Sequence, residues 1–465
     1  MKKTLLLAAL SMCTVAPTMA QEAADASYLR NSLYMIKLDM PTDRPEYQEA
    51  FKIMNTAYDG IDFGKRYQSY NDFSLNVRHL DFAKMPTVTQ EEMDAIEKET
   101  KVEKMIREAV NAQLKESGLK DNVAPEVEYA AKLMKYFEQN HFANKIVVKW
   151  FSAKDADPSK PGKWDLSVIQ ELGLKGLSVE ARDAAMKSEN MRNAASGIAA
   201  TDKLLGNDYI CVNRYGYMSA EEVVAATTAL LESQMASLPA IAQIPLKKGI
   251  EKLASNIKGY FVRANAYLFQ LDWQNGTKDF YAKYWNNGTA PANFITSAPY
   301  KLKYVGKSSK RAPATMSLKG ANREEELITR ATLRGTDAAI AALQRDYEDF
   351  RPMSSLHVSE DGKQLIAYIG MKEGLKEGDD FDVYQKAEGD DGVVAWQKIG
   401  SISVAKGGVW DNREGAGQQI EGAAEDKTEK ETTNKNPYTI FKGNVKKFGE
   451  GCLIKLAGGK DKKKK

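Results

Sequence analysis

Hydrophobic residues recur along this chain in two spacings, and each spacing predicts a different kind of element. Four short apolar stretches have the length and composition of β-strands: Ser32–Leu38, Lys145–Phe151, Tyr209–Val212 and Tyr300–Val305. The continuous run in Lys145–Phe151 is typical of a strand that is buried on both faces. After the last strand, residues 306–321 are polar and rich in Lys, Ser, Ala, Pro and Gly, so they are expected to form a loop.

The longest predicted strand is Lys258–Trp273, whose two faces carry different side chains because residues alternate along a strand. One face holds Tyr260, Val262, Ala264, Ala266 and Leu268, and the other holds Arg263, Asn265 and Tyr267. We expect this segment to be the central strand of its domain, with the small-residue face buried and the face of Asn265 open. Asn275-Gly276 predicts a tight hairpin, and Phe280–Trp285 is expected to be the return strand.

Apolar residues at helical spacing, combined with start and stop signals, predict the helices. Thr89 and Glu92 form a capping box that opens one helix reaching Leu114, and Ser219 with Glu222 forms a second capping box. Further helices are expected over Pro45–Tyr58, from Pro125 to Asn140, from Ser178 to Gly206 and from Asn322 to Tyr347, the last with a break at Gly335.

Beyond Pro352 the pattern changes to short alternating segments separated by turn residues, which is typical of a small β-domain. The expected strands are Leu365–Ile369, Phe381–Tyr384, Val393–Ile399, Ile402–Val404 and Cys452–Leu456. Residues 413–436 are rich in Glu, Lys, Gly and Thr with almost no apolar residue, so they are expected to form a disordered loop.

The first 20 residues have the pattern of a secretory signal peptide. Lys2 and Lys3 precede the apolar core Leu5–Leu10, and small residues at Thr18 and Ala20 predict cleavage before Gln21. Met12 stands where a lipoprotein signal needs a small residue, so no lipid is expected on Cys13. We therefore expect an exported bacterial protein, periplasmic or associated with the outer membrane.

The remaining chain divides by composition into four parts. These are an N-terminal α+β segment (21–142), a central α/β domain (143–350), the small β-domain with its loop (351–457) and a basic tail (458–465). The 465 residues are 43% hydrophobic and 28% charged, enough for a core and a soluble surface. The formal charge of +3 becomes +1 without Lys2 and Lys3, which gives no general case for nucleic acid. No transmembrane helix is expected after the leader.

Two segments resemble known families. Gly206-Asn207-Asp208-Tyr209-Ile210-Cys211-Val212, followed by the long strand to Asp272, is similar to the α/β domain of curli-secretion and flagellar-assembly periplasmic proteins. Gly374-Leu375-Lys376-Glu377-Gly378-Asp379 with Phe381–Tyr384 resembles the small β-domain of the flagellar-assembly type. Most of the mature chain also resembles a family of exported Bacteroidota proteins. These resemblances imply an α+β fold, a central mixed sheet packed with helices followed by an SH3-like barrel, but no catalytic residue; residues 21–140 and the absent lipid-anchor cysteine depart from the assembly families.

Candidate chemistry is sparse. The three histidines, His79, His141 and His357, lack ligand spacing, and His141 is expected to complement a helix C-terminus. Asp155, Asp157 and Ser159 begin like a calcium loop, but Lys160 and Leu166 break that pattern. Gly306-Lys307-Ser308 lacks the first glycine of a phosphate-binding loop, since Lys301 occupies its place; Asp379-Asp380 and Asp390-Asp391 are interpreted as solvated turn charges.

The two remaining cysteines, the basic tail and a set of aromatic residues can each be interpreted structurally or functionally. Cys211 and Cys452 are open to pairing, and we favour two separate buried thiols. The basic tail, Lys460 and Lys462–Lys465, either contacts anionic envelope polymers or is only solubilising. An aromatic set either binds a sugar or peptide or, as we favour, packs the sheet: Tyr260, Phe261, Tyr267, Phe269, Trp273, Tyr281, Tyr284 and Trp285.

The sequence therefore assigns no catalytic, cofactor-binding or metal-binding residue and no cofactor. We expect an exported cell-envelope protein that binds or scaffolds an envelope protein or polymer without catalysing a reaction. The alternative is an envelope hydrolase acting on glycan or peptide, whose carboxylates converge only in the folded chain. Ligand, oligomeric state and membrane face are not encoded in any motif.

Overall fold

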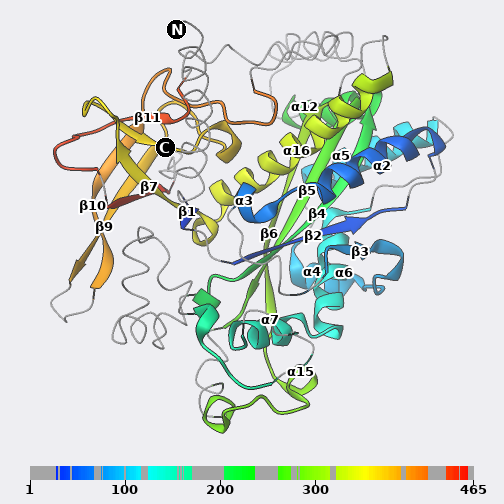
Figure 1. Ribbon diagram of the computed structural model, residues 1–465. Coiled ribbons are helices and arrows are strands. Elements are labelled where there is room, and N and C mark those ends of the chain that lie inside the picture. Colours follow the sequence, from blue (N-terminus) through cyan, green and yellow to red (C-terminus); the bar gives the residue numbers. More distant parts are fainter. Residues whose placement is uncertain are drawn as a thin grey trace, which may run out of the picture.

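The computed structural model describes residues 28–29, 32–41, 44–67, 75, 77–98, 101–116, 124–153, 157, 160, 162–169, 204–235, 260–273, 280, 283–314, 321–388, 394–416, 436–449 and 451–458. These residues form an α+β fold with two sheets (Figure 1). A five-stranded mixed sheet lies between two layers of helices, and a closed barrel of six antiparallel strands lies beside it. None of the described helices is long and apolar enough to cross a membrane.

The mixed sheet has the strand order β3-β2-β4-β5-β6. β2 pairs in parallel with β3 and β4, whereas β4, β5 and β6 are antiparallel. The prediction that Lys258–Trp273 is the central strand is wrong in position, because β4 is in the middle and β5 is one place further out. The bounds are β2 (Leu33–Asp39), β3 (His79–Asp81), β4 (Tyr209–Ser219), β5 (Tyr260–Leu271) and β6 (Leu302–Pro313).

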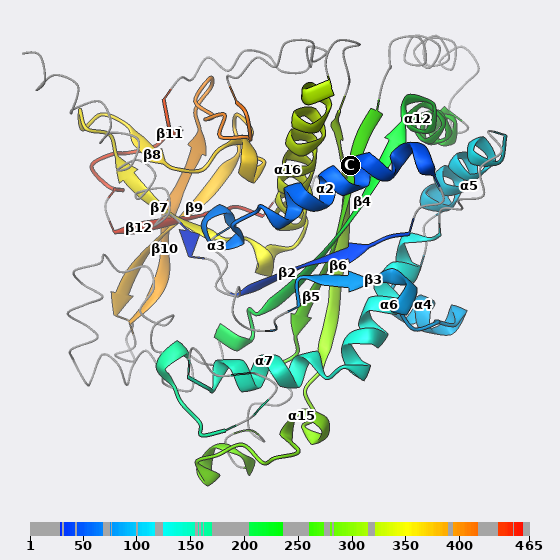
Figure 2. The same ribbon diagram turned by 45° about the vertical axis from the view of Figure 1, so that its right-hand side comes forward.

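Helices cover both faces of this sheet (Figure 2). The first face, which holds the small residues of β5, packs against α2 (Gln48–Asp59), α3 (Phe63–Tyr67) and α16 (Ala321–Asp346). The second face packs against α6 (Glu126–Gln139) and α7 (Phe142–Trp150). Asn265, on the second face, is 1% exposed, so the expectation of an open face is wrong. β5 is buried on both sides because a second helical layer covers it.

Short helices and one helix pair complete this part of the molecule. α5 (Lys101–Glu116) packs on α12 (Ala220–Met235) through a small apolar cluster. The others are η1 (Pro45–Tyr47), η2 (Phe82–Lys84), α4 (Gln90–Ile96), η3 (Trp285–Asn287), α15 (Phe294–Ser297) and η4 (Glu348–Phe350). Both predicted capping boxes are confirmed: Thr89 exchanges hydrogen bonds with Glu92, and Ser219 with Glu222.

Several sequence predictions are corrected. Lys145–Phe151 is not a strand but most of α7, because its run of apolar residues is too short to distinguish a buried helix from a buried strand. The helix predicted from Thr89 divides into α4 and α5, since Glu97 has an extended backbone. The expected loop after residue 305 is strand as far as Pro313. The described residues of Phe280–Trp285 are helical or in turns, not a return strand.

α16 runs through Gly335 without the predicted break. A Cβ atom at this position would lie 3.3 Å from the Cβ of Ala264 on β5 and 3.8 Å from that of Ala312 on β6. Glycine therefore permits close contact between the helix and the sheet rather than ending the helix. This contact also explains why β5 carries alanines on the same face.

The barrel consists of β7 (Met353–Val358), β8 (Leu365–Ala367), β9 (Asp380–Glu388), β10 (Val394–Val404), β11 (Thr439–Lys442) and β12 (Cys452–Leu456), with η5 (Met371–Glu373) between β8 and β9. It closes because β8 pairs with both β11 and β7. β10 joins the two strands predicted over residues 393–404, with a register shift between Lys398 and Gly400. β7 and β11 were not predicted, and residues 417–435 of the expected loop lie outside the described residues.

The barrel and the mixed sheet are connected at several points. β1 (Tyr28–Leu29) pairs with β7 of the barrel, only a few residues before β2 of the mixed sheet. Arg66 forms ion pairs with Asp337 of α16 at 2.7 Å and with Glu414 at 3.0 Å, and its carbonyl accepts from Lys372 at 3.1 Å. The contacts of Arg66 join residues 271 to 348 positions apart.

Candidate functional site

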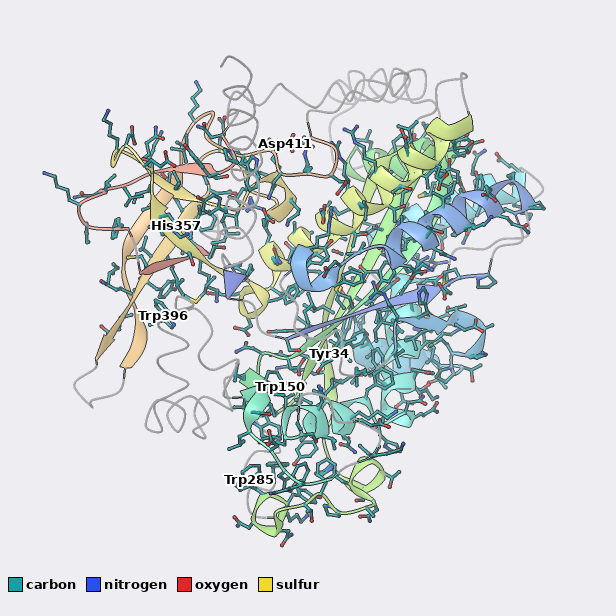
Figure 3. The ribbon with its side chains drawn as sticks, in the orientation of Figure 1. Tyr34, Trp150, Trp285, His357, Trp396 and Asp411 are labelled. Carbon is teal, nitrogen blue, oxygen red and sulfur yellow. The ribbon has the colours of Figure 1, made fainter. Side chains whose placement is uncertain are left out.

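The sequence candidates do not come together in one place. His79 lies between Asp39 and Asp59, with nitrogen–oxygen distances of 3.0 and 2.7 Å, and His357 lies on the barrel (Figure 3). His141 follows the end of α6, near the helix C-terminus as predicted, with a left-handed backbone (φ 54°). Within the described part of the chain, no three His, Cys, Asp or Glu side chains are arranged to hold a metal ion.

The cysteines, Asp379 and the described aromatic residues have structural roles. Cys211 and Cys452 are both buried and neither forms a disulfide, as favoured. Asp379 forms an ion pair with Arg345 of α16. Tyr267, Phe269 and Trp273 are fully buried in the core of the second face, which confirms the packing interpretation for these rings. Several predictions fall outside the described residues. They concern Asp155, Ser159, the hairpin Asn275-Gly276, Tyr281, Asp390-Asp391, the basic tail and most of Ser178–Leu205.

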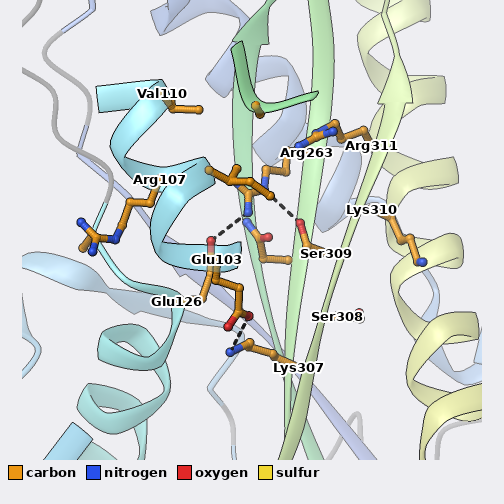
Figure 4. A pocket seen from close by; sticks show the side chains of 14 residues that line it. Glu103, Arg107, Val110, Glu126, Arg263, Lys307, Ser308, Ser309, Lys310 and Arg311 are labelled. Atoms are coloured by element: carbon orange, nitrogen blue, oxygen red, sulfur yellow. Dashed lines mark hydrogen bonds and ion pairs between the residues drawn. The ribbon is translucent and has the colours of Figure 1, made fainter. Parts of the chain in front are cut away.

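The second face of the sheet changes from apolar to polar along its length. Near α7 it carries Phe269 and Leu271, whereas toward the start of β5 it carries Arg263 and Asn265. α5 lies over this polar half and leaves a pocket of about 450 Å³, which we call the cationic cavity (Figure 4). Its lining is Glu103, Ile106, Arg107, Val110, Ala124, Glu126, Ala226, Arg263, Asn265, Lys307, Ser308, Ser309, Lys310 and Arg311.

Glu126 is the acidic centre of the cationic cavity. As the first residue of α6 it lies at a helix N-terminus, which favours a negative charge. It accepts hydrogen bonds from Arg214 at 2.7 and 2.9 Å, from Arg263 at 3.0 Å and from the Tyr267 hydroxyl. Burial alone would raise the pKa of Glu126, but Arg214, Arg263 and Tyr267 outweigh it and lower the pKa to about 2. The carboxylate is therefore ionised at any physiological pH.

Arg263 and Arg311 face each other directly across the β5–β6 pair. Like charges in this relation are destabilising unless an anion lies between or beside them. Arg263 is engaged by Glu126 and by Ser309, whose hydroxyl accepts from Nε at 2.9 Å, but Arg311 has no hydrogen bond or ion pair with any described residue. Although the side chain is exposed as a whole, desolvation of its guanidinium and the charge of Arg263 lower the pKa of Arg311.

Asn265 lies beside this arginine pair. Its side chain is buried, yet neither its amide nitrogen nor its amide oxygen has a hydrogen-bond partner among the described residues. A buried polar group without a partner costs about 1–3 kcal/mol, so such groups are uncommon outside functional sites. Asn265 therefore offers a donor and an acceptor to a bound molecule.

A second pocket of about 410 Å³ adjoins the first, and we call it the aromatic cavity. It lies between the sheet and the segments around η1, η2 and α5. Besides Arg263, Asn265, Val110 and Ala124, which it shares with the cationic cavity, it is lined by Met40, Pro41, Arg44, Tyr47, Phe51, Phe82, Leu114, Glu128, Tyr129, Lys132, Arg214, Tyr215, Gly216, Tyr217, Met218 and Glu222.

Asp208 is the other carboxyl group whose acidity is strongly changed. It is completely buried beside Trp150, whose indole nitrogen donates to it, and burial raises its pKa well above the usual range. Asp208 lines neither cavity, so this carboxyl group belongs to the core rather than to the site.

Comparison of the chain with protein-family models and with curated proteins finds no match. The geometry of the two cavities is consequently the ground on which a function is proposed.

Proposed function

We propose that this chain is an exported cell-envelope binding protein that takes an anionic group into its cationic cavity and catalyses no reaction of its own. The observation that carries the proposal is the Arg263–Arg311 pair, in which one guanidinium has no described partner. A carboxylate or phosphate between these guanidinium groups relieves their repulsion and accepts several charge-assisted hydrogen bonds. The amide of Asn265 adds a donor at the same place.

The hydrolase alternative receives less support from the cavity. A general acid needs a pKa near the working pH, whereas the pKa of Glu126 is about 2. The second carboxylate of the cavity, Glu103, forms an ion pair with Lys307 at 3.0 Å. Asp208, whose pKa is raised, is sealed in the core. The described carboxylates thus hold the fold and the arginines in place.

Binding of small anions tests the proposal. Calorimetric titration of the full chain with inorganic phosphate and with acetate is expected to show binding, and Arg311→Ala is expected to weaken it at least about tenfold, since a hydrogen bond to a charged group is worth about 1.5–3 kcal/mol. Asn265→Asp places a carboxylate beside the arginines and is expected to abolish binding.

Lys303→Ala is the matched control, because Lys303 lies on β6 with an exposed side chain and lines neither cavity. It removes the same charge from the same strand and is expected to leave the affinity within about twofold. No binding of either anion by the wild-type chain would overturn the proposal. Equal losses in Lys303→Ala and Arg311→Ala would show that only the general surface charge attracts anions.

The envelope location rests on the leader pattern of residues 1–20, and the proposed ligand is an envelope molecule with an anionic group. We also propose that the barrel is SH3-like, which its small size and antiparallel closure support. The intact mass of the protein recovered from cells tests the export. The expected mass is that of a chain that begins at Gln21 and carries no lipid. The mass of an uncleaved or acylated chain would contradict the prediction.

A further inference from the structure

We infer that the ligand is a single-chain anionic amphiphile, whose carboxylate or phosphate head binds in the cationic cavity and whose apolar chain lies in the aromatic cavity. This inference rests on the proposed function and adds the chemistry of the rest of the ligand. It is carried by three observations: the contact between the two cavities, the charge balance of the aromatic cavity and its apolar lining.

The two cavities meet at the anion site itself. Arg263, Asn265, Val110 and Ala124 line both of them. A head group bound by Arg263 and Asn265 therefore lies against residues that also line the second cavity. With about 450 and 410 Å³, each cavity is within the range of small-molecule sites.

The charges that line the aromatic cavity are already compensated. Arg44 pairs with Glu222 at 2.7 Å, and Lys132 pairs with Glu128 at 2.9 Å. Arg214 pairs with Glu126. Each of these three cations also lies over an aromatic ring. Arg44 is 4.9 Å from the ring centroid of Tyr47, and Lys132 is 4.6 Å from that of Phe82. Arg214 is 4.0 Å from the ring centroid of Tyr129. This cavity therefore has no free charge with which to attract a second ionic group.

Between these pairs the lining is apolar and adaptable. Met40 and Met218 contribute flexible thioether chains, and Phe51, Leu114 and Tyr217 contribute apolar area. Gly216 leaves space, since a Cβ atom there would meet only the Cβ of Arg263, at 3.9 Å. Methionines adapt to chains of varying shape, so this lining fits an alkyl chain better than a rigid polar group. The polar and apolar halves together match an amphiphile.

Chain-length dependence of binding tests the inference. The full chain is titrated with acetate, butyrate, hexanoate and octanoate below their micelle concentrations, and with octyl phosphate and the uncharged octanol. The affinity is expected to rise with each methylene by up to about fourfold, and by more than tenfold from butyrate to octanoate. Octanol is expected to bind much more weakly than octanoate. Comparison of octanoate with octyl phosphate distinguishes a fatty acid from a phosphate monoester.

Met40→Trp fills part of the aromatic cavity at a residue that does not line the cationic cavity. It is expected to leave acetate and phosphate binding unchanged and to remove the gain from chain length. Met218→Thr, a second variant, removes apolar area from the lining of the aromatic cavity. The affinity is expected to rise less steeply with chain length in this variant. If acetate and octanoate bind the wild type equally, the inference is overturned while the proposed anion site stands. If neither acetate nor octanoate binds, the anion site and the amphiphile inference are both overturned. If octanol binds as well as octanoate, the charged head group does not contribute to binding and the inference is wrong.

Discussion

Replacing Val262 with aspartate is expected to prevent the chain from folding to a soluble product. Val262 is completely buried on the first face of β5, in the cluster that α16 covers. Arg44 lies over Tyr47 at the edge of this cluster but is already paired with Glu222, so a carboxylate at position 262 would be desolvated without a partner. The cost is at least several kcal/mol, comparable with the roughly 5–15 kcal/mol by which a typical domain is stable. Soluble yield and thermal unfolding of the purified fraction measure it.

The matched control is Asn265→Asp, three residues further along β5 and equally buried. It is expected to fold, although not because this face is open to solvent. Asn265 pairs across the sheet with Arg214 and lies two residues from Arg263, so a carboxylate here gains cationic neighbours. If the two variants lose solubility to the same degree, the electrostatic difference between the two faces is wrong.

Glu126→Gln is expected to destabilise the protein by about 3–5 kcal/mol at neutral pH, the range for breaking one side of a buried ion pair. The change leaves Arg214 and Arg263 without their shared counter-charge. Urea unfolding of the variant and the wild type measures the difference in free energy. A difference below about 1 kcal/mol at pH 7 would contradict the assigned role of Glu126.

The same pair of proteins gives a pH dependence with a defined sign. The pKa of Glu126 is about 2 in the folded chain and about 4.3 in an unfolded one, so the ionised carboxylate stabilises the fold above pH 4.3. This stabilisation is lost as the pH falls through about 2, and it corresponds to about 3 kcal/mol. The advantage of the wild type over Glu126→Gln is therefore expected to shrink between pH 4.5 and 2. A difference that stays constant over this range would show that Glu126 does not titrate as described.

Much of the fold could be predicted wherever local patterns and tertiary packing agree. The alternation along β5 and the capping boxes at Thr89 and Ser219 specify their elements directly, and the structure has them. The prediction failed at α7, since its apolar run is too short to distinguish a buried helix from a buried strand. It also failed at Gly335, because the sequence alone does not show whether a glycine ends a helix or permits close packing within one.

The candidate site could not be predicted for a related reason. Arg263 and Asn265 were placed correctly on one face of a strand, but β6 beyond residue 305 has no apolar alternation and was interpreted as a loop. Arg311 and Ser309 therefore had no predicted position. Net charge gave no signal either, since the cations of the cavity are balanced by acidic residues elsewhere in the chain. Only the register of β5 with β6 brings the two arginines together.

The pairing of β1 with β7 sets an order on biosynthesis. β1 leaves the ribosome more than 300 residues before its partner, which at about 5–20 residues per second corresponds to a delay of roughly 15–60 s. β2 likewise waits for β4, its parallel neighbour, which begins at Tyr209. β1 consequently remains without its partner until most of the chain has been made, whereas β2 can pair earlier, first with β3 and then with β4. A nascent chain of this kind depends on whatever holds it unfolded in the meantime, and synthesis that stops before β7 leaves β1 without a barrel to join.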